Sequence, residues 1–307
     1  MAFGLLHRSL DAFAVWTEDR LRREPEALRL AAAEPLRCFD PLPPLPAAPG
    51  REPVWSAPSP RPLAPGDRLW VRVTPARGER RGTALLVPPW KIARPELVKG
   101  YAALLSRAGW EVWLISPPRH LERTPAGARS GEGFVSLDLG QLRAVFEQLV
   151  VELRLCAALA AREGPVGLVG LSLGALAGAL AATAPEHLDF AALVAPPTLA
   201  QVMTATGIGR RYQRLALRAG SRWPDEETLA SVLAPFDPSP RAPTARRLLI
   251  AAGLHDRIVL GDGPCELARA WGTPPHVYPR GHLSLLFLCR ALRRDLRAFV
   301  DGRGPQT

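Results

Sequence analysis

The stretch that decides the fold is Pro165-Val-Gly-Leu-Val-Gly-Leu-Ser-Leu-Gly-Ala-Leu-Ala-Gly178. Residues 166–169 form a short apolar run, as in strands that are buried on both faces. The chain then turns through Gly-Leu-Ser-Leu-Gly at residues 170–174, and small residues begin a helix directly after the turn. A strand, a G-x-S-x-G turn and a helix in succession predict a sharp bend with Ser172 at its tip.

The two glycines of this turn meet a steric requirement. A serine at so sharp a bend holds a strained backbone, and the residues two before and two after it must clear the neighbouring main chain. Glycine has no Cβ, so Gly170 and Gly174 permit that approach. The helix that begins near Leu173 offers unpaired N–H groups and the positive end of its dipole beside the serine. The alternative at this point is a glycine-rich turn with an incidental serine.

The chain of 307 residues is long enough for one large core with a small appendage. Its 47% hydrophobic and 22% charged residues are ordinary for a soluble globular protein. The net charge of +10 comes almost entirely from arginine, because Lys91 and Lys99 are the only lysines. The arginines are scattered without an interleaved aromatic stripe, so we expect no nucleic-acid partner. Attraction to acidic substrates or to a membrane face stays open.

The four cysteines show no C-x-x-C spacing, so we expect no disulfide framework, no metal site and no cofactor. No run of about 18 apolar residues is present, and no transmembrane segment is therefore predicted. Asp11, Glu18 and Asp19 interrupt the apolar stretches near the N-terminus, which argues against a secretory signal. These features favour a reduced, cytoplasmic protein, and they do not indicate its oligomeric state.

Composition divides the chain into an N-terminal extension over residues 1–65 and a main domain over residues 66–303. Residues 1–34 have the spacing of one or two amphipathic helices. Residues 35–65 are dense in proline, which favours an extended conformation and excludes a helix or a central strand. Such a leader recruits a partner or wraps the surface of its own domain, and the second role is favoured.

The main domain begins with two strand patterns and continues with alternating strands and helices. Residues 69–73 alternate as a half-buried strand and residues 83–87 are apolar throughout, so we expect an antiparallel hairpin. A helix over residues 97–108 and a strand over residues 110–115 then begin an alternation that predicts an α/β fold, with a mostly parallel sheet and helices on both faces. Further strands are expected at residues 190–194, 246–251 and 276–278, and helices at residues 137–161 and 284–300.

Residues 198–243 break this alternation with a basic helical stretch at residues 210–219 and a short helix at residues 225–233. An insertion at this place is positioned to form a small helical cap over the crevice at the carboxyl edge of the sheet. Surface helices that cover the edges of the sheet are the alternative.

A serine hydroxyl is a weak nucleophile, so Ser172 needs a base to accept its proton and a third group to orient that base. His282 is the best placed of the six histidines, because it follows the last expected strand and begins the final helix. Asp256 follows directly after the strand at residues 246–251 and is the favoured acid. Its rivals are Asp225, Asp237 and Asp262.

The negative oxygen that forms when a serine attacks a carbonyl group needs two N–H donors. The backbone N–H of Leu173 is one candidate, and the loop after the second expected strand supplies the other. Pro88 and Pro89 have no N–H, so Trp90 is the first residue of this loop able to donate, with Lys91 second.

Residues 116–134 form a long polar loop after an expected strand. In an open α/β sheet, loops at the carboxyl ends of strands border the ligand crevice. The rim of the substrate pocket is therefore expected to have basic and aromatic walls, formed by Trp90, Lys91, Arg119, His120 and Arg123.

Three motifs resemble those of the α/β-hydrolase superfamily in their order along the chain, namely Gly170-Leu-Ser-Leu-Gly174, Gly-Leu-His-Asp256 and Gly281-His282. The resemblance covers about residues 66–300 and implies the α/β-hydrolase fold. It also implies Ser172 as nucleophile, His282 as acid and base, and Asp256 as the orienting acid. Many members carry His-Gly before the oxyanion residue, whereas this chain has two prolines, so its loop is expected to be stiffer.

These residues predict a serine hydrolase that cleaves a carboxylic ester, or a related acyl bond of a small molecule, through an acyl-enzyme. An acyltransferase that uses the same three residues, with an alcohol or amine as acceptor, is one alternative. A non-catalytic protein that uses the fold and the proline-rich leader for binding is another.

Overall fold

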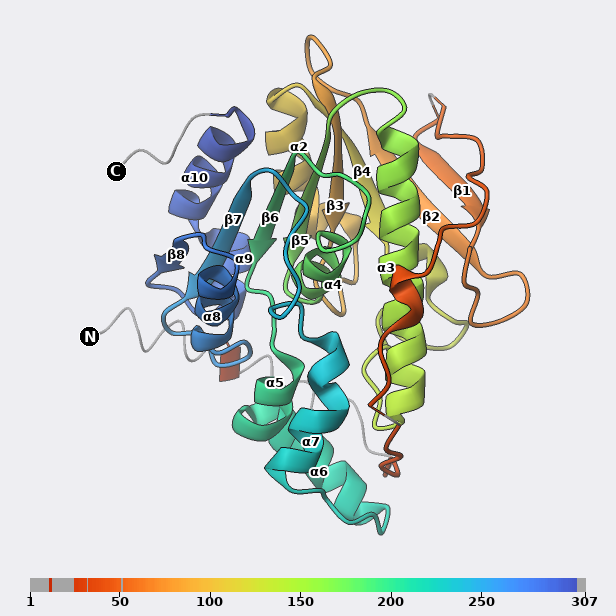
Figure 1. The fold of residues 1–307 in the computed structure, drawn as a ribbon, viewed down its shortest axis with the longest axis vertical. Coiled ribbons are helices and arrows are strands. Elements are labelled where there is room, and N and C mark those ends of the chain that lie inside the picture. The colour runs from red at the N-terminus through yellow and green to blue at the C-terminus, as the bar shows by residue number, and fades with distance from the viewer. Residues whose placement is uncertain (1–10, 13–24, 32, 51, 303–307) are drawn as a thin grey trace.

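The centre of the molecule is an eight-stranded sheet, seen in a computed structural model that describes residues 11–12, 25–31, 33–50 and 52–302 (Figure 1). The strands lie side by side in the order β1-β2-β4-β3-β5-β6-β7-β8. Their bounds are Val54–Pro58, Arg68–Thr74, Gly82–Val87, Trp110–Ser116, Val166–Leu171, Phe190–Val194, Leu248–Gly253 and Pro275–Tyr278 for β1 to β8. The pairings of β1 with β2 and of β2 with β4 are antiparallel, and the others are parallel. The mostly parallel sheet expected from the sequence is confirmed.

The expected hairpin between β2 and β3 is wrong, because β4 lies between these two strands. Val71 of β2 is opposite Ile115 on one edge of β4, and Leu85 of β3 is opposite Trp113 on the other. Every residue of β4 except Glu111 is buried, so this strand is too apolar for a sheet edge and needs a neighbour on each side. The residues between β2 and β3 cannot reveal this arrangement, because the strand that pairs with both of them, β4, comes later in the chain.

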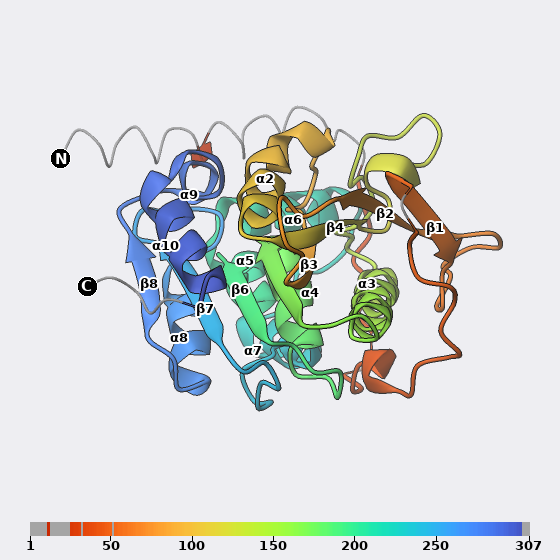
Figure 2. The same cartoon turned by 90° about the horizontal axis from the view of Figure 1, so that it is seen from above.

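Helices cover both faces of the sheet (Figure 2). Those on one face are α2 (Lys99–Arg107), α9 (His282–Leu288) and α10 (Arg290–Val300), and those on the other are α3 (Leu139–Ala160), α4 (Leu173–Ala181) and α8 (Asp262–Ala270). Alternate side chains of β3 enter the two cores, since Leu85 and Val87 pack with α3 and α4 whereas Ala84 and Leu86 pack with α2. The fold is thus a three-layer sandwich with a sheet buried on both faces.

The single closing helix expected over residues 284–300 is wrong, because α9 and α10 are separate helices. The chain breaks at Cys289, whose backbone is extended with φ −80° and ψ 100°. The sulfur of Cys289 accepts a hydrogen bond from the N–H of Leu292 at 3.4 Å and so caps the start of α10. The break leaves α9 as a short helix that begins at His282.

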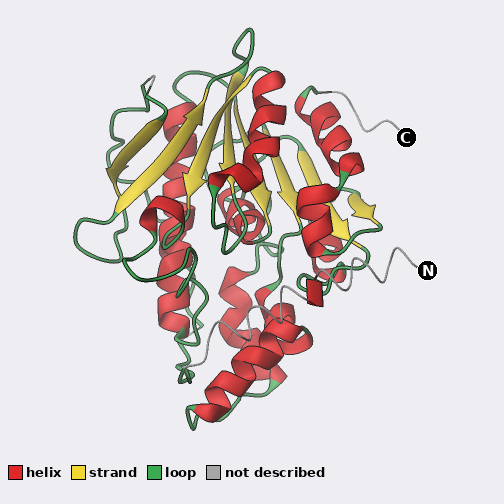
Figure 3. Ribbon diagram, turned by 180° about the vertical axis from the view of Figure 1, so that it is seen from behind, coloured by secondary structure: helices red, strands yellow, loops and turns green. Residues whose placement is uncertain are grey.

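Three further helices project beyond the carboxyl edge of the sheet, where Figure 3 shows them in red below the yellow strands. They are α5 (Leu199–Ala205), α6 (Gly207–Arg218) and α7 (Glu226–Leu233). Leu137, two residues before the start of α3, packs against Tyr212 and Leu215 of α6. The hydroxyl of Tyr212 donates to the carbonyl of Val135 at 3.2 Å. Residues 198–243 therefore lie over the end of the sheet where β5 turns into α4.

The described parts of the N-terminal segment lie on the main domain. β1 belongs to the central sheet, so the sheet extends into the segment that composition assigned to the N-terminal extension. A 3-10 helix at Arg37–Phe39 lies against α3, where the guanidinium of Arg154 donates to the carbonyl of Asp40 at 2.8 Å. The helices expected over residues 1–34 fall largely outside the described residues, but the expectation is wrong for residues 25–31 and 33–34, which form no helix. Arg29 is extended there and forms a β-bridge with Asp138, because this part of the chain pairs with the segment before α3. Within the described ranges, no helix has both the length and the apolar character that a membrane crossing requires.

Candidate active site

The turn between β5 and α4 has the strained backbone that its sequence predicts. Ser172 has φ +51° and ψ −114°, in a region that residues with a side chain rarely adopt. A Cβ on Gly170 would lie 2.4 Å from the carbonyl oxygen of Gly174, and a Cβ on Gly174 would lie 2.3 Å from that of Val87. Both distances are too short for any side chain, so the steric requirement for glycine at these two positions is confirmed.

Three side chains from different loops form a linear hydrogen-bond chain at the carboxyl edge of the sheet. The Oγ of Ser172 is 2.9 Å from Nε2 of His282, and Nδ1 of His282 is 2.7 Å from Oδ2 of Asp256. Ser172 follows β5, Asp256 follows β7 and His282 follows β8. All three residues are buried. The three residues singled out from the sequence are thus brought together, although they are separated by 110 and 26 positions along the chain.

The carboxylate of Asp256 is held in place by the loop that carries it. Its Oδ1 accepts hydrogen bonds from the N–H groups of Ile258 and Val259, both at 2.8 Å. This arrangement leaves Oδ2 for His282 and fixes the direction in which the imidazole points. The rival acids lie elsewhere, since Asp225 caps α7, Asp237 bonds Ser239 and Asp262 is the first residue of α8.

The electrostatic surroundings of His282 favour its protonated form. Burial acts to lower the pKa of His282, but the charge of Asp256, the hydrogen bond to Asp256 and the charge of Asp11 together raise it above its ordinary value. An imidazolium at this position is therefore stabilised by its neighbours. That is the protonation state that the histidine adopts after it accepts a proton from a serine.

His120 ties the loop after β3 to the loop after β4 and does not line the pocket described below. Its Nδ1 is 2.8 Å from the carbonyl oxygen of Pro118, and its Nε2 accepts a hydrogen bond from the N–H of Lys91 at 3.1 Å. Burial, together with the charges of Arg123 and Lys91, lowers the pKa of His120 to about 4 despite the bond to Pro118. The ring is therefore neutral, with its proton on Nδ1.

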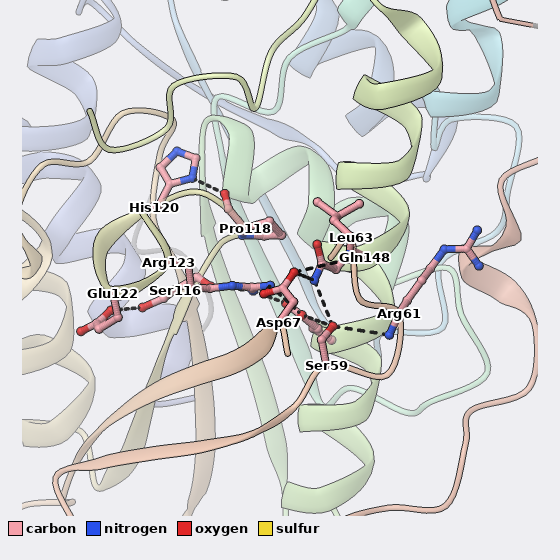
Figure 4. Close-up of polar contacts among 11 residues, drawn as sticks. Ser59, Arg61, Leu63, Asp67, Ser116, Pro118, His120, Glu122, Arg123 and Gln148 are labelled. Atoms are coloured by element: carbon pink, nitrogen blue, oxygen red, sulfur yellow. Dashed lines mark hydrogen bonds and ion pairs between the residues drawn. The ribbon is translucent and has the colours of Figure 1, made fainter. Parts of the chain in front are cut away.

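Arg123 also lies away from the pocket, in a buried polar network drawn in Figure 4. Its guanidinium contacts Glu152 at 2.6 Å and Asp67 at 3.1 Å. Gln148 donates to the same Asp67 at 2.7 Å, and Ser59 donates to Glu152 at 2.7 Å. Because both acids face the guanidinium, Arg123, in the loop after β4, joins α3 to the loop between β1 and β2.

Lys91 and Arg119 complete the set of expected rim residues, and neither of them lines the pocket. The ammonium of Lys91 lies over the ring of Trp90, 4.6 Å from its centre. Arg119 has φ +62° at the tip of its turn, and its carbonyl accepts from the N–H of Gly131 at 2.7 Å. The polar groups of these loops thus hold the loops to one another.

The pocket beside Ser172 is apolar. It has an empty volume of about 680 Å³, part of it open to solvent, and lies between α3 and the helices α5, α6 and α7. Among the described residues, Ser136 and Ser172 are the only ones with hydroxyl or charged side chains in its lining, and Trp90 is the only expected wall residue found there. The other walls are apolar side chains, among them Leu139, Leu142, Val202, Met203, Ile208 and Leu233. The expectation of basic walls is therefore replaced by an aliphatic lining from helices that are far apart in sequence.

No cluster of three or more His, Cys, Asp or Glu side chains suited to a metal ion occurs within the described ranges. Asp256 and His282 are hydrogen-bonded to each other, and His282 is also hydrogen-bonded to Ser172.

Comparison with known proteins places the chain by its fold. No protein-family model matches it, and no curated protein matches it. Acetyl xylan esterase from Paenibacillus sp. R4 superposes with a TM-score of 0.57 at 13% identity, over 99% of this chain and 95% of that one. Acetyl xylan esterase 1 from Thermoanaerobacterium sp. JW/SL YS485 superposes with a TM-score of 0.54 at 16% identity, over 76% of this chain and 79% of that one. A soluble variant of monoglyceride lipase from Saccharomyces cerevisiae superposes with a TM-score of 0.54 at 12% identity, over 90% of this chain and 100% of that one.

Architecture and superpositions agree on one fold. The chain has the α/β-hydrolase fold, as the motifs in its sequence implied.

Proposed function

We propose that this protein is a serine hydrolase that cleaves carboxylic esters of small molecules through an acyl-enzyme intermediate. The observation that carries the proposal is the hydrogen-bond chain from Ser172 through His282 to Asp256, at 2.9 and 2.7 Å, beside an apolar pocket. This geometry supplies a nucleophile, a base within reach of its proton and an acid that orients the base.

The first half of the reaction forms the acyl-enzyme. As Oγ of Ser172 attacks the ester carbonyl carbon, its proton passes to Nε2 of His282, and Asp256 stabilises the imidazolium. When the tetrahedral intermediate collapses, the C–O bond to the alcohol breaks and His282 returns the proton to the leaving alkoxide. Water then repeats the sequence in the second half, which releases the carboxylic acid and restores the serine.

Two backbone N–H groups are proposed to bind the negative oxygen of the intermediate. Leu173 is the first residue of α4, where a backbone N–H has no acceptor one turn earlier in the helix. In the loop after β3, Pro88 and Pro89 have no N–H, and the N–H of Lys91 is bonded to His120. Trp90 is therefore the proposed second donor, and it lines the same pocket as Ser172 and Leu173.

The lining of the pocket indicates the kind of acyl group that fits there. Aliphatic side chains and Trp90 surround the space next to Ser172, and no charged side chain is among the described residues that line it. We therefore propose esters with an aliphatic acyl chain longer than acetyl as substrates. Each methylene buried against such walls contributes about 0.8 kcal/mol, or roughly fourfold in kcat/KM.

The test uses a fluorophosphonate probe and p-nitrophenyl esters. We expect the wild-type protein to be labelled and to hydrolyse the esters, and Ser172→Ala to lose labelling and at least roughly 10⁴-fold in hydrolysis. Ser136→Ala is the matched control, because it removes the other hydroxyl of the pocket lining and should still be labelled. Labelling of Ser172→Ala, or none of the wild type, contradicts the proposal.

A further inference from the structure

A carboxylate from the N-terminal segment reaches the loops that carry the acid and the base of the proposed triad. Oδ2 of Asp11 accepts hydrogen bonds from the N–H of His282 at 2.8 Å and from the N–H of Arg257 at 3.1 Å. Oδ1 accepts from the N–H of Leu283 at 3.1 Å. Asp11 is fully buried, and it is 271 positions from His282 in the chain.

These contacts serve the start of α9, which has no capping side chain of its own. Gly281 occupies the N-cap position and has no side chain, and the hydroxyl of Ser284 is bonded to the N–H of Gly281 at 3.0 Å. The first N–H groups of the helix, on His282 and Leu283, therefore need an acceptor from elsewhere. Asp11 supplies that acceptor, and its negative charge also suits the positive end of the helix.

The same carboxylate joins two loops that the mechanism needs at a fixed separation. Arg257 adjoins Asp256 in the loop after β7, whereas His282 follows β8. A single side chain that binds both main chains limits relative movement of the acid and the base. The geometry of the 2.7 Å contact between Asp256 and His282 depends on that limit.

We infer that Asp11 is a positioning residue of this active site: it caps the helix that begins at His282, ties that helix to the loop of Asp256, and places a second negative charge near the imidazole. The inference rests on the proposed serine hydrolase function. Asp11 is not among the residues that line the pocket, and it acts through His282.

The charges around the imidazole agree with this role. Burial lowers the pKa of His282, and the charge and hydrogen bond of Asp256 raise it. The charge of Asp11 adds a smaller effect that also raises it. Burial and the charge of Asp256 raise the pKa of Asp11 itself, while its three N–H bonds lower it. Asp11 and Asp256 thus surround one histidine with two carboxylates, which favours the imidazolium formed during acyl transfer.

The experiment measures kcat, KM and the pH dependence of kcat/KM for full-length Asp11→Asn, Asp11→Ala and wild-type protein with p-nitrophenyl esters. Removal of the charge should lower the inflection on the acid side of the profile by roughly half a pH unit. Loss of the tie should reduce kcat about tenfold with KM little changed. Asp225→Asn is the control, because it removes the carboxylate that caps α7 through Thr228 and should leave the profile in place.

A titration of the His282 ring by NMR, assigned with His282→Gln, tests the same point without turnover. Asp11→Asn should lower the measured pKa of the ring. An unchanged pKa and unchanged kcat overturn the inference, as does a loss of thermal stability with an unmoved pH profile. If Asp11→Ala does not fold, Asp11→Asn decides. If the wild type neither hydrolyses esters nor reacts with the probe, the proposed function fails. The ring titration then still tests whether Asp11 raises the pKa of His282.

Discussion

At the scale of single residues, Ser172 has an energetically unfavourable backbone conformation, which is possible because Gly170 and Gly174 have no side chains. Its φ of +51° places the residue in the left-handed region, with a ψ of −114° that moves it further from favoured values. The main chains of Gly174 and Val87 approach one another so closely that no Cβ fits between them. The position of the Ser172 hydroxyl at the tip of this turn is thus a product of close backbone packing.

Gly174→Ala tests this packing directly. The new Cβ would lie 2.3 Å from the carbonyl oxygen of Val87, and backbone cannot move as a flexible side chain can. We expect a loss of roughly 2 kcal/mol in the free energy of unfolding in urea, with labelling by the fluorophosphonate probe strongly reduced. Gly100→Ala, inside α2, is the control, since its Cβ would meet only the flexible Arg293 at 3.4 Å. Equal stability of the two variants would count against this account.

At the scale of elements, the loop after β3 is shaped by a histidine from a different loop. Lys91 has φ +60°, and His120 accepts its N–H. Gly131 completes the contact, because its carbonyl accepts from the indole N–H of Trp90 at 2.9 Å. The position of Trp90, the proposed oxyanion donor, is therefore set by the loop over residues 116–134.

This contact predicts a dependence of stability on pH. The pKa of His120 is about 4 when folded and 6.5 ordinarily, so the unfolded chain binds more protons between these values. Stability should be fully present above pH 6.5 and be lost as the pH falls toward 4, with about 2 kcal/mol lost between pH 7 and pH 5. Urea denaturation at both pH values measures this loss, and His120→Gln should remove that part of the change.

The control for this experiment is His187→Gln, which replaces an exposed histidine and should leave the slope of stability against pH as in the wild type. An unchanged slope in His120→Gln would show that another group is responsible for the acid sensitivity.

At the scale of the whole molecule, the pocket exists because α5, α6 and α7 meet α3 above the carboxyl edge of the sheet. Leu139 and Leu142 come from α3, Met203 comes from α5 and Leu233 comes from α7. None of these walls is complete without the other element. The size and polarity of the site are therefore properties of the assembled fold.

Filling this pocket should change the preference for acyl length. Wild-type kcat/KM is expected to rise from acetyl to hexanoyl p-nitrophenyl esters. The rise should be roughly fourfold for each methylene of the acyl group that contacts the pocket walls. Met203→Trp should narrow the space, reducing activity on hexanoyl esters about tenfold or more and on acetyl esters far less. Leu217→Trp, at an exposed position of α6, is the control. A flat profile for the wild type would contradict the proposed acyl site.

The amino-acid sequence by itself determined the features that depend on neighbouring residues. The run from Pro165 to Gly178 has the strand, turn and helix that its pattern predicts, and the glycine spacing predicts the strain at Ser172. The spacing of apolar residues likewise predicted most strands and helices, because the period of that spacing is set by the local backbone geometry of each element. The order of Ser172, Asp256 and His282 along the chain pointed to three side chains that the structure brings within hydrogen-bond distance.

Tertiary structure alone decided what depends on distant contacts. It placed β4 between β2 and β3, built the apolar pocket from helices far apart in sequence, and turned His120 and Arg123 from expected pocket residues into ties between loops. It also brought Asp11 to the start of α9. Local patterns report whether a side chain is buried, but not which partner buries it. That choice is made by the packing of the whole chain, where charge and shape are matched across hundreds of residues.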